Sequence, residues 1–209
     1  MSRRLLWAVL VLTLGGVLAA WMVTTMRSGP RSGASDGVAL DSFGAVPDFA
    51  LTDQLGQPAT RADLAGQPWV ADFIFTRCGG PCPRMSERMA RIAGGLSPDS
   101  KVRFVSFTVD PEYDTPAVLA EYATALGAES PRWRFLTGPR RDILRVSIDG
   151  FHLAMGVAEV DSATALMNVA HSTRFVLVDA IGIIRGYYDG EDEVALASLE
   201  RDIRLLAGK

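Results

Sequence analysis

The chain has 209 residues, a length typical of one domain with appendages rather than of a large two-domain enzyme. Hydrophobic residues make up 48% and charged residues 22% of the sequence, which excludes a low-complexity or disordered chain. The formal net charge is -3, but residues 1–32 contain four arginines and no acid, so the remainder has 17 basic and 24 acidic residues, a net charge of -7. A body this acidic lacks the basic surface of a nucleic-acid-binding protein, and we exclude that class.

Residues 5–26 are 22 consecutive residues without a charge, long enough as a helix to cross about 30 Å of hydrocarbon. A cleaved signal has a shorter apolar run and ends at a small-x-small site, whereas the candidate here, Val17-Leu18-Ala19, lies inside the run. We therefore predict an uncleaved transmembrane anchor at residues 1–27. A tether rich in Gly and Ser follows at 28–45, and a folded domain at 46–209.

The charges around the apolar run favour neither orientation, because Arg3 and Arg4 precede it and Arg27 and Arg31 follow it. Large domains translocate largely regardless of charge, so we expect the N-terminus inside and the domain outside. No presequence precedes the apolar run, which favours a bacterial over a mitochondrial membrane. We expect a single-pass protein of the bacterial inner membrane whose domain faces the periplasm.

Strand and helix patterns alternate along the body of the chain. The run WVADFIFT at 69–76 is apolar and β-prone, as in a buried strand, and Met85, Met89 and Ile92 then repeat at helical spacing. The remaining predicted elements are a hairpin or strand-turn lead-in from residue 46, a helix starting at Pro83, a strand at 102–109, a capped helix from 114 to 127, a short strand at 133–136, a helix at 141–146, a hairpin at 174–178 and 183–188, and a helix at 191–206. This order predicts an α/β, thioredoxin-like fold: a central mixed sheet flanked by helices, with one N-terminal transmembrane helix.

The chain has two cysteines, Cys78 and Cys82, in a CxxxC arrangement where the first long strand turns into its helix. A structural disulfide is a weak explanation, because closing so small a ring contributes only about 2 kcal/mol. A thiolate at a helix N-terminus is favoured by the unpaired amides there, which predicts a lowered pKa. Two soft thiolates favour Cu(I) or zinc, and the same pair can cycle as a redox pair.

Two thiolates do not complete a metal site, and the sequence offers two histidines as a third ligand. His171 directly precedes a predicted strand, at a loop end that this fold brings toward the cysteines. His152, in DGFHLAMG, has no comparable placement. We predict a metal site formed by Cys78, Cys82 and His171.

Other donors are weaker candidates. Met85, Met155 and Met167 carry soft thioethers, but the helical spacing of Met85 and Met89 indicates a core position instead. Asp110 precedes a proline at a strand end, which is typical of a turn or cap residue, with a supporting role beside the metal as the alternative.

Three segments together resemble the Sco/SenC family in order and spacing: PDFALTDQLGQPATRADLAGQPWVADFIFTRCGGPCPRM, VDPEYDTPAVLAEYA and HSTRFVLVDAIGIIRGYYDG. The resemblance implies a membrane-anchored, thioredoxin-like copper chaperone that binds copper through Cys78, Cys82 and His171, with Pro83 completing the CxxxCP motif. Its implied acceptor is the dinuclear copper site of cytochrome c oxidase subunit II or a similar site. Another periplasmic copper chaperone or a thiol reductase is the other implied partner.

Two departures from the family pattern concern the site itself. Gly79-Gly80-Pro81 replaces the more usual Pro-Asp-x between the cysteines, and Ala170 stands where the family often has Asp before the histidine. The three ligands are retained, so copper binding is better supported than the choice of acceptor.

Two other readings use the same residues. A thiol-disulfide oxidoreductase would use Cys78 and Cys82 as its catalytic redox pair without metal, but such enzymes resemble one another in CxxC and in a later proline, and no proline follows Pro139. A peroxiredoxin-like enzyme carries TxxC, whereas this chain has TxC. A redox or copper sensor remains open. We expect a metallochaperone rather than an enzyme.

Overall fold

The computed structural model describes residues 40–128, 131–153 and 173–208. The predicted anchor at 1–27 and most of the predicted tether lie outside these ranges. Within them, no helix has both the length and the apolar character needed to cross a membrane.

A seven-stranded sheet forms the centre of the domain, in the order β2-β1-β5-β4-β3-β6-β7. Its three inner strands β5, β4 and β3 are parallel, and the outer pairings are antiparallel. The predicted mixed sheet is confirmed. The strands are β1 (Ala50–Asp53), β2 (Pro58–Thr60), β3 (Trp69–Ile74), β4 (Arg103–Thr108), β5 (Trp133–Thr137), β6 (Arg174–Val178) and β7 (Ile184–Asp189).

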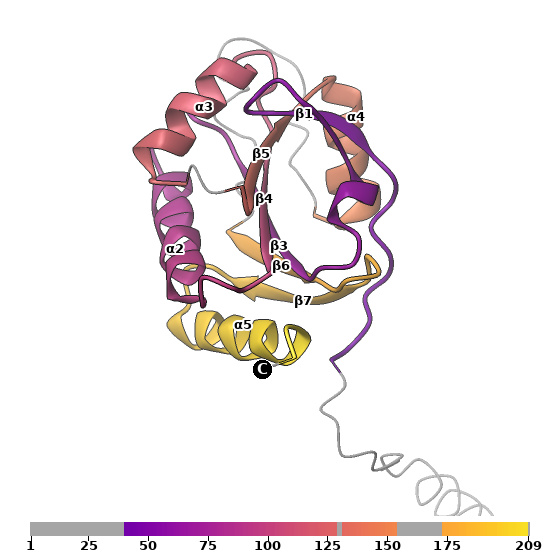
Figure 1. Cartoon of the computed structure of the whole chain (residues 1–209). Coiled ribbons are helices and arrows are strands. Elements are labelled where there is room, and N and C mark those ends of the chain that lie inside the picture. Colours follow the sequence, from indigo (N-terminus) through magenta and orange to yellow (C-terminus); the bar gives the residue numbers. More distant parts are fainter. Residues whose placement is uncertain (1–39, 129–130, 154–172, 209) are drawn as a thin grey trace, which may run out of the picture. The chain divides into compact units, whose positions relative to one another are not determined.

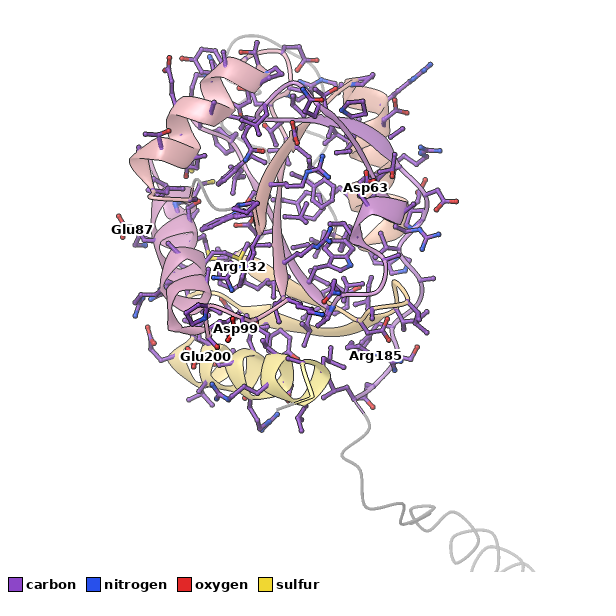
Figure 2. All side chains as sticks on the ribbon, in the orientation of Figure 1. Asp63, Glu87, Asp99, Arg132, Arg185 and Glu200 are labelled. Atoms are coloured by element: carbon purple, nitrogen blue, oxygen red, sulfur yellow. The ribbon has the colours of Figure 1, made fainter. Side chains whose placement is uncertain are left out.

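Helices cover both faces of this sheet (Figure 1). The apolar sides of α2 (Pro81–Gly95), α3 (Pro116–Ala125) and α5 (Glu193–Leu206) share one buried cluster. The opposite cluster includes α4 (Arg140–Arg145) and the π-helical turn Val146–Gly150, together with the short 3-10 helix η1 (Arg61–Leu64). Charged side chains such as Glu87 of α2 point away from the sheet (Figure 2). The predicted helical flanks are therefore confirmed.

Strand β3 divides its side chains between the two clusters because successive residues of a strand point to opposite faces. Val70 and Ile74 pack on the side of α2, α3 and α5, whereas Ala71 and Phe73 pack on the side of α4. By the same alternation, Asp72 lies on the α2 face. The apolar sequence of β3, in which Asp72 is the one polar residue, thus reflects a strand buried on both faces.

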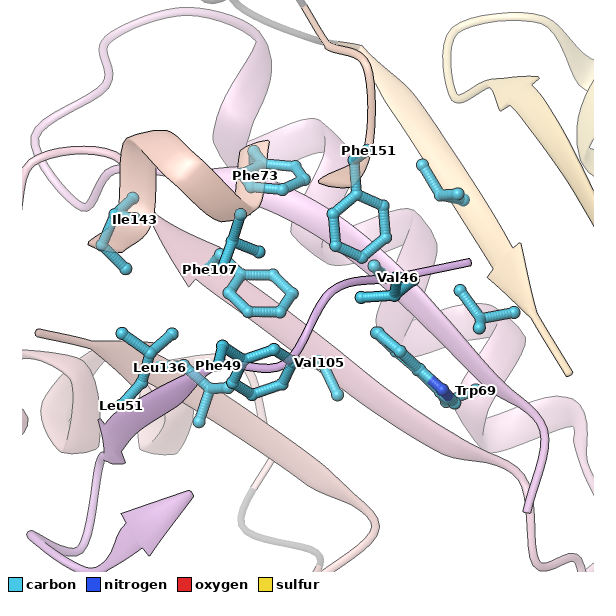
Figure 3. Close-up of a cluster of buried hydrophobic side chains, with 14 of the residues drawn as sticks. Val46, Phe49, Leu51, Trp69, Phe73, Val105, Phe107, Leu136, Ile143 and Phe151 are labelled. Atoms are coloured by element: carbon cyan, nitrogen blue, oxygen red, sulfur yellow. The ribbon is translucent and has the colours of Figure 1, made fainter. Parts of the chain in front are cut away.

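The cluster on the α4 side is organised around aromatic rings from distant segments (Figure 3). Phe107 of β4 stacks on Phe73 of β3 with ring centroids 5.2 Å apart, and it meets Phe49 edge-on at 5.5 Å. Phe151, which follows the π-helical turn, lies 5.4 Å from Phe73 and 5.7 Å from Phe107. Phe107 is therefore the ring shared by both parallel strands, the N-terminal lead-in and the α4 segment.

Helix α2 begins at Pro81, two residues before the predicted start at Pro83. The prediction was wrong because Pro81 itself occupies the first turn, where the missing N–H of a proline costs no hydrogen bond. The correction matters for the site, because it places Cys82 on the helix rather than in the loop.

Replacing Phe107 by Ala is expected to lower the free energy of unfolding by about 3 to 5 kcal/mol, because the lost ring leaves a cavity between four packed segments. Chemical denaturation followed by circular dichroism measures this change. Leu55→Ala is the control, since Leu55 is 73% exposed and should change stability by less than about 0.5 kcal/mol. Equal effects of the two substitutions would contradict the assignment of Phe107 to the core.

Candidate metal and thiol site

The two cysteines lie at the carboxyl edge of the parallel strands. Cys78 is in the loop that follows β3, and Cys82 is the second residue of α2. The parallel pairing of β3 with β4 and of β4 with β5 brings the segments after all three strands to this edge. Open α/β sheets bind their ligands at such an edge.

Both cysteines are present as thiols rather than as a disulfide, and both are buried, with exposed fractions of 7% and 5%. The loop between them is exposed at Gly79 and Gly80. A Cβ added at Gly80 would lie 4.0 Å from the Cys78 sulfur, so the backbone of this loop runs directly over that thiol. The backbone of this exposed loop thus lies against the Cys78 thiol.

The helix N-terminus does not lower the pKa of Cys82, contrary to the prediction from sequence. Burial, with smaller contributions from the neighbouring Cys78 and Asp72, raises the pKa of the Cys82 thiol to about 12. Desolvation disfavours the charged thiolate more strongly than the first-turn amides favour it. Cys82 therefore needs a cation or a proton acceptor close by before it can act as a thiolate.

Asp114 fixes the segment that leads into Cys78. Its buried carboxylate accepts hydrogen bonds from the Thr76 backbone N–H at 3.1 Å and from the Thr76 hydroxyl at 2.5 Å. It also accepts one from the Thr108 hydroxyl at 2.5 Å. Because Thr76 follows β3 and Thr108 ends β4, one carboxylate joins the ends of both strands two residues before Cys78.

Asp110 holds the next residue of the same loop. It accepts hydrogen bonds from Arg77 Nε at 3.2 Å and Nη2 at 2.5 Å, and the Arg77 guanidinium also lies 4.1 Å from the centre of the Tyr113 ring. Its backbone carbonyl accepts from the N–H groups of Tyr113 and Asp114, as expected of a turn residue. Asp110 therefore combines the predicted turn role with an ion pair beside Cys78.

Asp114→Ala is expected to lower the free energy of unfolding by about 3 kcal/mol, because it leaves one buried and two half-buried donors without their acceptor. It should also increase the rate at which a thiol reagent labels Cys78, since Thr76 is released. Denaturation curves and labelling followed by mass spectrometry measure the two effects. Asp99→Ala is the matched control, because Asp99 is exposed at the surface (Figure 2). Unchanged labelling in a folded Asp114→Ala variant would refute the positioning role.

Asp72 is an acidic residue that the sequence reasoning did not single out. Its side chain lies in the middle of β3 with 1% of its surface exposed, and neither carboxylate oxygen has a hydrogen-bond partner among the described residues. This burial raises the pKa of Asp72 from 3.8 to about 7. The sequence does contain a signal for this residue, because Asp72 is the one acid inside the apolar run WVADFIFT.

The pKa of Asp72 predicts a pH dependence of stability. Between about pH 4 and pH 7 the folded state retains a proton that the unfolded chain has lost, so the free energy of unfolding falls as the pH rises through this range. At pH 8 the resulting loss in the free energy of unfolding reaches about 4 kcal/mol, and below pH 4 there is no loss. Asp72→Asn should remove this part of the pH dependence in denaturation experiments at pH 4 to 8. If the free energy of unfolding depends on pH in the same way in both proteins, the prediction is contradicted. The carboxylate of Asp72 would then be stabilised by a partner.

His171, the predicted third ligand, lies outside the described residues, as do Ala170, Met155 and Met167. Among the residues that are described, no group of three His, Cys, Asp or Glu side chains could hold a metal ion. His152 is exposed, with a left-handed backbone φ of 50°, between two residues of the α4-side cluster. Met85 is a buried core residue, as predicted.

The chain re-enters the described structure close to α2. The Gly190 N–H donates to the Thr173 carbonyl at 2.6 Å, which ties the start of β6 to the turn after β7. The Gly190 backbone packs directly on Met85, because an added Cβ would lie 2.3 Å from the Met85 sulfur. Arg88 of α2 donates to the Gly190 carbonyl. Thr173 therefore lies one hydrogen bond away from a residue packed on the helix that carries Cys82.

The comparisons with known proteins agree with this geometry. The family model described as SCO1/SenC matches residues 40–205, which is most of the chain. The chain belongs to the SCO1/SenC family. The predicted resemblance to Sco/SenC proteins is thus confirmed, and with it the thioredoxin-like α/β fold.

Three relatives show how far the similarity extends. The chain is 31% identical over 160 residues to the SCO1 protein homolog of Bacillus subtilis, covering 76% of this chain and 81% of that protein. It is 28% identical to the solved BsSco, a member of the Sco family of cytochrome c oxidase assembly proteins described as having a disulfide switch, with a TM-score of 0.64 over 84% of this chain and 98% of that one. It is 27% identical to Bradyrhizobium japonicum ScoI, solved with copper bound, with a TM-score of 0.59 over 76% of this chain and 99% of that one.

Proposed function

We propose that this SCO1/SenC protein is a copper chaperone that carries Cu(I) on Cys78 and Cys82. The observation that carries the proposal is the placement of two buried thiols, four residues apart, at the start of α2 and under an exposed loop. Thiolates are soft ligands that select Cu(I) over hard cations. A cation between them also offsets the burial that raises the pKa of Cys82. The copper held by a solved relative, ScoI of Bradyrhizobium japonicum, supports the same cargo.

His171 is proposed as the third ligand. One residue, Ser172, separates it from Thr173, so the chain between the two Cα atoms spans at most about 7 Å. Thr173 bonds to Gly190, which packs on α2 at Met85, three residues after Cys82. This short connection to a residue tied to the α2 neighbourhood supports the choice of His171. A neutral imidazole completes a three-coordinate site without adding negative charge.

Delivery is proposed to proceed by ligand exchange with the thiolates of an acceptor, the dinuclear copper site of cytochrome c oxidase subunit II. The exposed loop at Gly79 and Gly80 supports this step, because its backbone lies against the Cys78 thiol. The similarity to BsSco, a member of the Sco family of cytochrome c oxidase assembly proteins, supports the choice of acceptor. An N-terminal anchor in the bacterial inner membrane is proposed to hold the domain on the periplasmic side, where it raises the effective concentration of the acceptor.

An anaerobic Cu(I) titration of the reduced whole chain against a competing chelator tests the proposal. The wild type should hold one copper per chain. Replacing both Cys78 and Cys82 by Ser should abolish this copper, because no thiolate remains. His171→Ala should weaken binding about 10-fold to 100-fold through the loss of one ligand.

His152→Ala is the matched control, since it removes the chain's other histidine from an exposed position. It should bind copper as the wild type does. A reduced wild type that holds no copper against the chelator would overturn the copper assignment. Equal losses in the two histidine variants would overturn the assignment of His171 alone.

A further inference from the structure

We propose that a hollow beside Cys78 is the docking site for an acidic side chain of the acceptor protein. The hollow has a volume of about 500 Å³ and is lined by Arg77, Asp110, Glu112, Tyr113 and Arg140. None of these residues is a proposed copper ligand. The inference rests on the proposed function, because it takes Cys78 to be the point that the acceptor reaches, and it adds the surface that recognises this acceptor.

The segments that follow the three parallel strands build this hollow. Arg77 lies in the loop after β3, Glu112 in the loop after β4, and Arg140 at the first position of α4, which follows β5. Arg77 is also the residue directly before Cys78, so one side of the hollow lies one residue from the first thiol of the pair. A protein that reaches Cys78 therefore arrives next to these side chains.

Two guanidinium groups in the hollow have hydrogen-bond donors to spare, since each guanidinium carries five N–H donors. Asp110 accepts from Nε and Nη2 of Arg77, at 3.2 and 2.5 Å, and none of the described residues accepts from its Nη1. Glu112 accepts from Nε of Arg140 at 2.9 Å, and the two Nη groups of Arg140 have no acceptor within the described ranges. Unused donors of two arginines therefore line the same hollow.

The charges that the hollow presents to solvent are mainly positive. The side chains of Arg77 and Arg140 are 43% and 46% exposed, whereas that of Asp110 is only 8% exposed. Glu112 is the one exposed acid among the lining residues. The chain from residue 33 on has 17 basic and 24 acidic residues, so this hollow reverses the overall sign of charge next to a thiol. Its ligand is a carboxylate, because guanidinium donors match a carboxylate in both charge and geometry.

Tyr113 favours a protein as the source of this carboxylate. It is 45% exposed, and the Arg77 guanidinium lies 4.1 Å from the centre of its ring. Tyrosine and arginine are enriched among the residues that contribute most to binding in protein interfaces. Asp110 and Tyr113 also hold Arg77 in place before an acceptor arrives, so little side-chain freedom is lost on binding.

Thiol-disulfide exchange with acidic and neutral peptides tests this recognition without copper. The probes are the disulfide-linked dimers of two capped tripeptides, Glu-Cys-Glu and Gln-Cys-Gln, which place carboxylates or amides on both sides of the sulfur. The rate at which the reduced, copper-free whole chain loses its thiols is measured with each probe at pH 7. The rate with the Glu probe divided by the rate with the Gln probe measures the preference for acidic side chains, because changes in the reactivity of the thiols themselves cancel in this ratio.

Three substitutions at exposed positions should change this ratio differently. Arg140→Gln should lower it about threefold, as expected for the loss of a partly exposed ion pair. Glu112→Gln should raise it by a similar factor, because it removes the acid that competes for Arg140. Arg141→Gln is the matched control and should leave the ratio unchanged, since Arg141 is the next residue of α4, is 87% exposed and does not line the hollow. High salt should weaken the first two effects by screening the charges.

Equal ratios in the wild type, Arg140→Gln and Glu112→Gln would overturn the proposal, as would the same change in Arg140→Gln and Arg141→Gln. A wild type that reacts with neither probe would also overturn it, since no partner sulfur would then reach Cys78. A wild type that holds no copper but shows the expected changes would reject the chaperone proposal and keep the docking site. A wild type that holds copper but shows no change in the ratio would do the reverse.

Discussion

The carboxylate of Asp114 is the constraint on which the geometry of the thiol site depends. It binds Thr76 after β3 and Thr108 at the end of β4, so the two central parallel strands and the start of α3 share one buried acceptor. Cys78 follows Thr76 by two residues, and Cys82 follows on the helix that begins at Pro81. Cys78 is thereby held between two fixed points of the chain. Before it, Thr76 is hydrogen bonded to Asp114, and after it, α2 begins at Pro81.

The same arrangement explains why the core on the α4 side is so strongly aromatic. Phe73 and Phe107 lie on β3 and β4, just before the ends that Asp114 joins, and their stacked rings keep these strands aligned from the opposite face. Phe151 and Phe49 close this cluster from the two sides. Hydrogen bonds at the sheet edge and ring packing behind it therefore hold the same two strands. The loop that carries Cys78 therefore follows two strands that are held together from both faces.

Burial has a different effect on Asp72 than on Asp114. Asp114 is stabilised by three donors, whereas Asp72 has none and its pKa is raised to about 7. Both acids lie near the cysteines, yet one holds the loop in place and the other is left able to change its charge. The difference follows from their neighbours rather than from the residue type.

Periodicity and local signals in the sequence were sufficient to predict the element order, the mixed sheet and the CxxxC pair as the candidate site. Buried strands, helical apolar spacing and turn residues act over a few residues, so they can be read without the fold. The start of α2 was misplaced because two prolines, Pro81 and Pro83, both fit a first turn. His171 as the third ligand stays a prediction.

The tertiary structure decided the electrostatics of the site. The sequence could indicate that Cys82 lies near a helix start, but whether amides or burial control its pKa depends on what covers the thiol. The partners of Asp114 and the lack of partners at Asp72 likewise depend on residues brought together from separate strands and helices. Local sequence therefore determined which groups the site contains, whereas long-range packing determined their charge states, because solvation and hydrogen bonding depend on the surroundings in space.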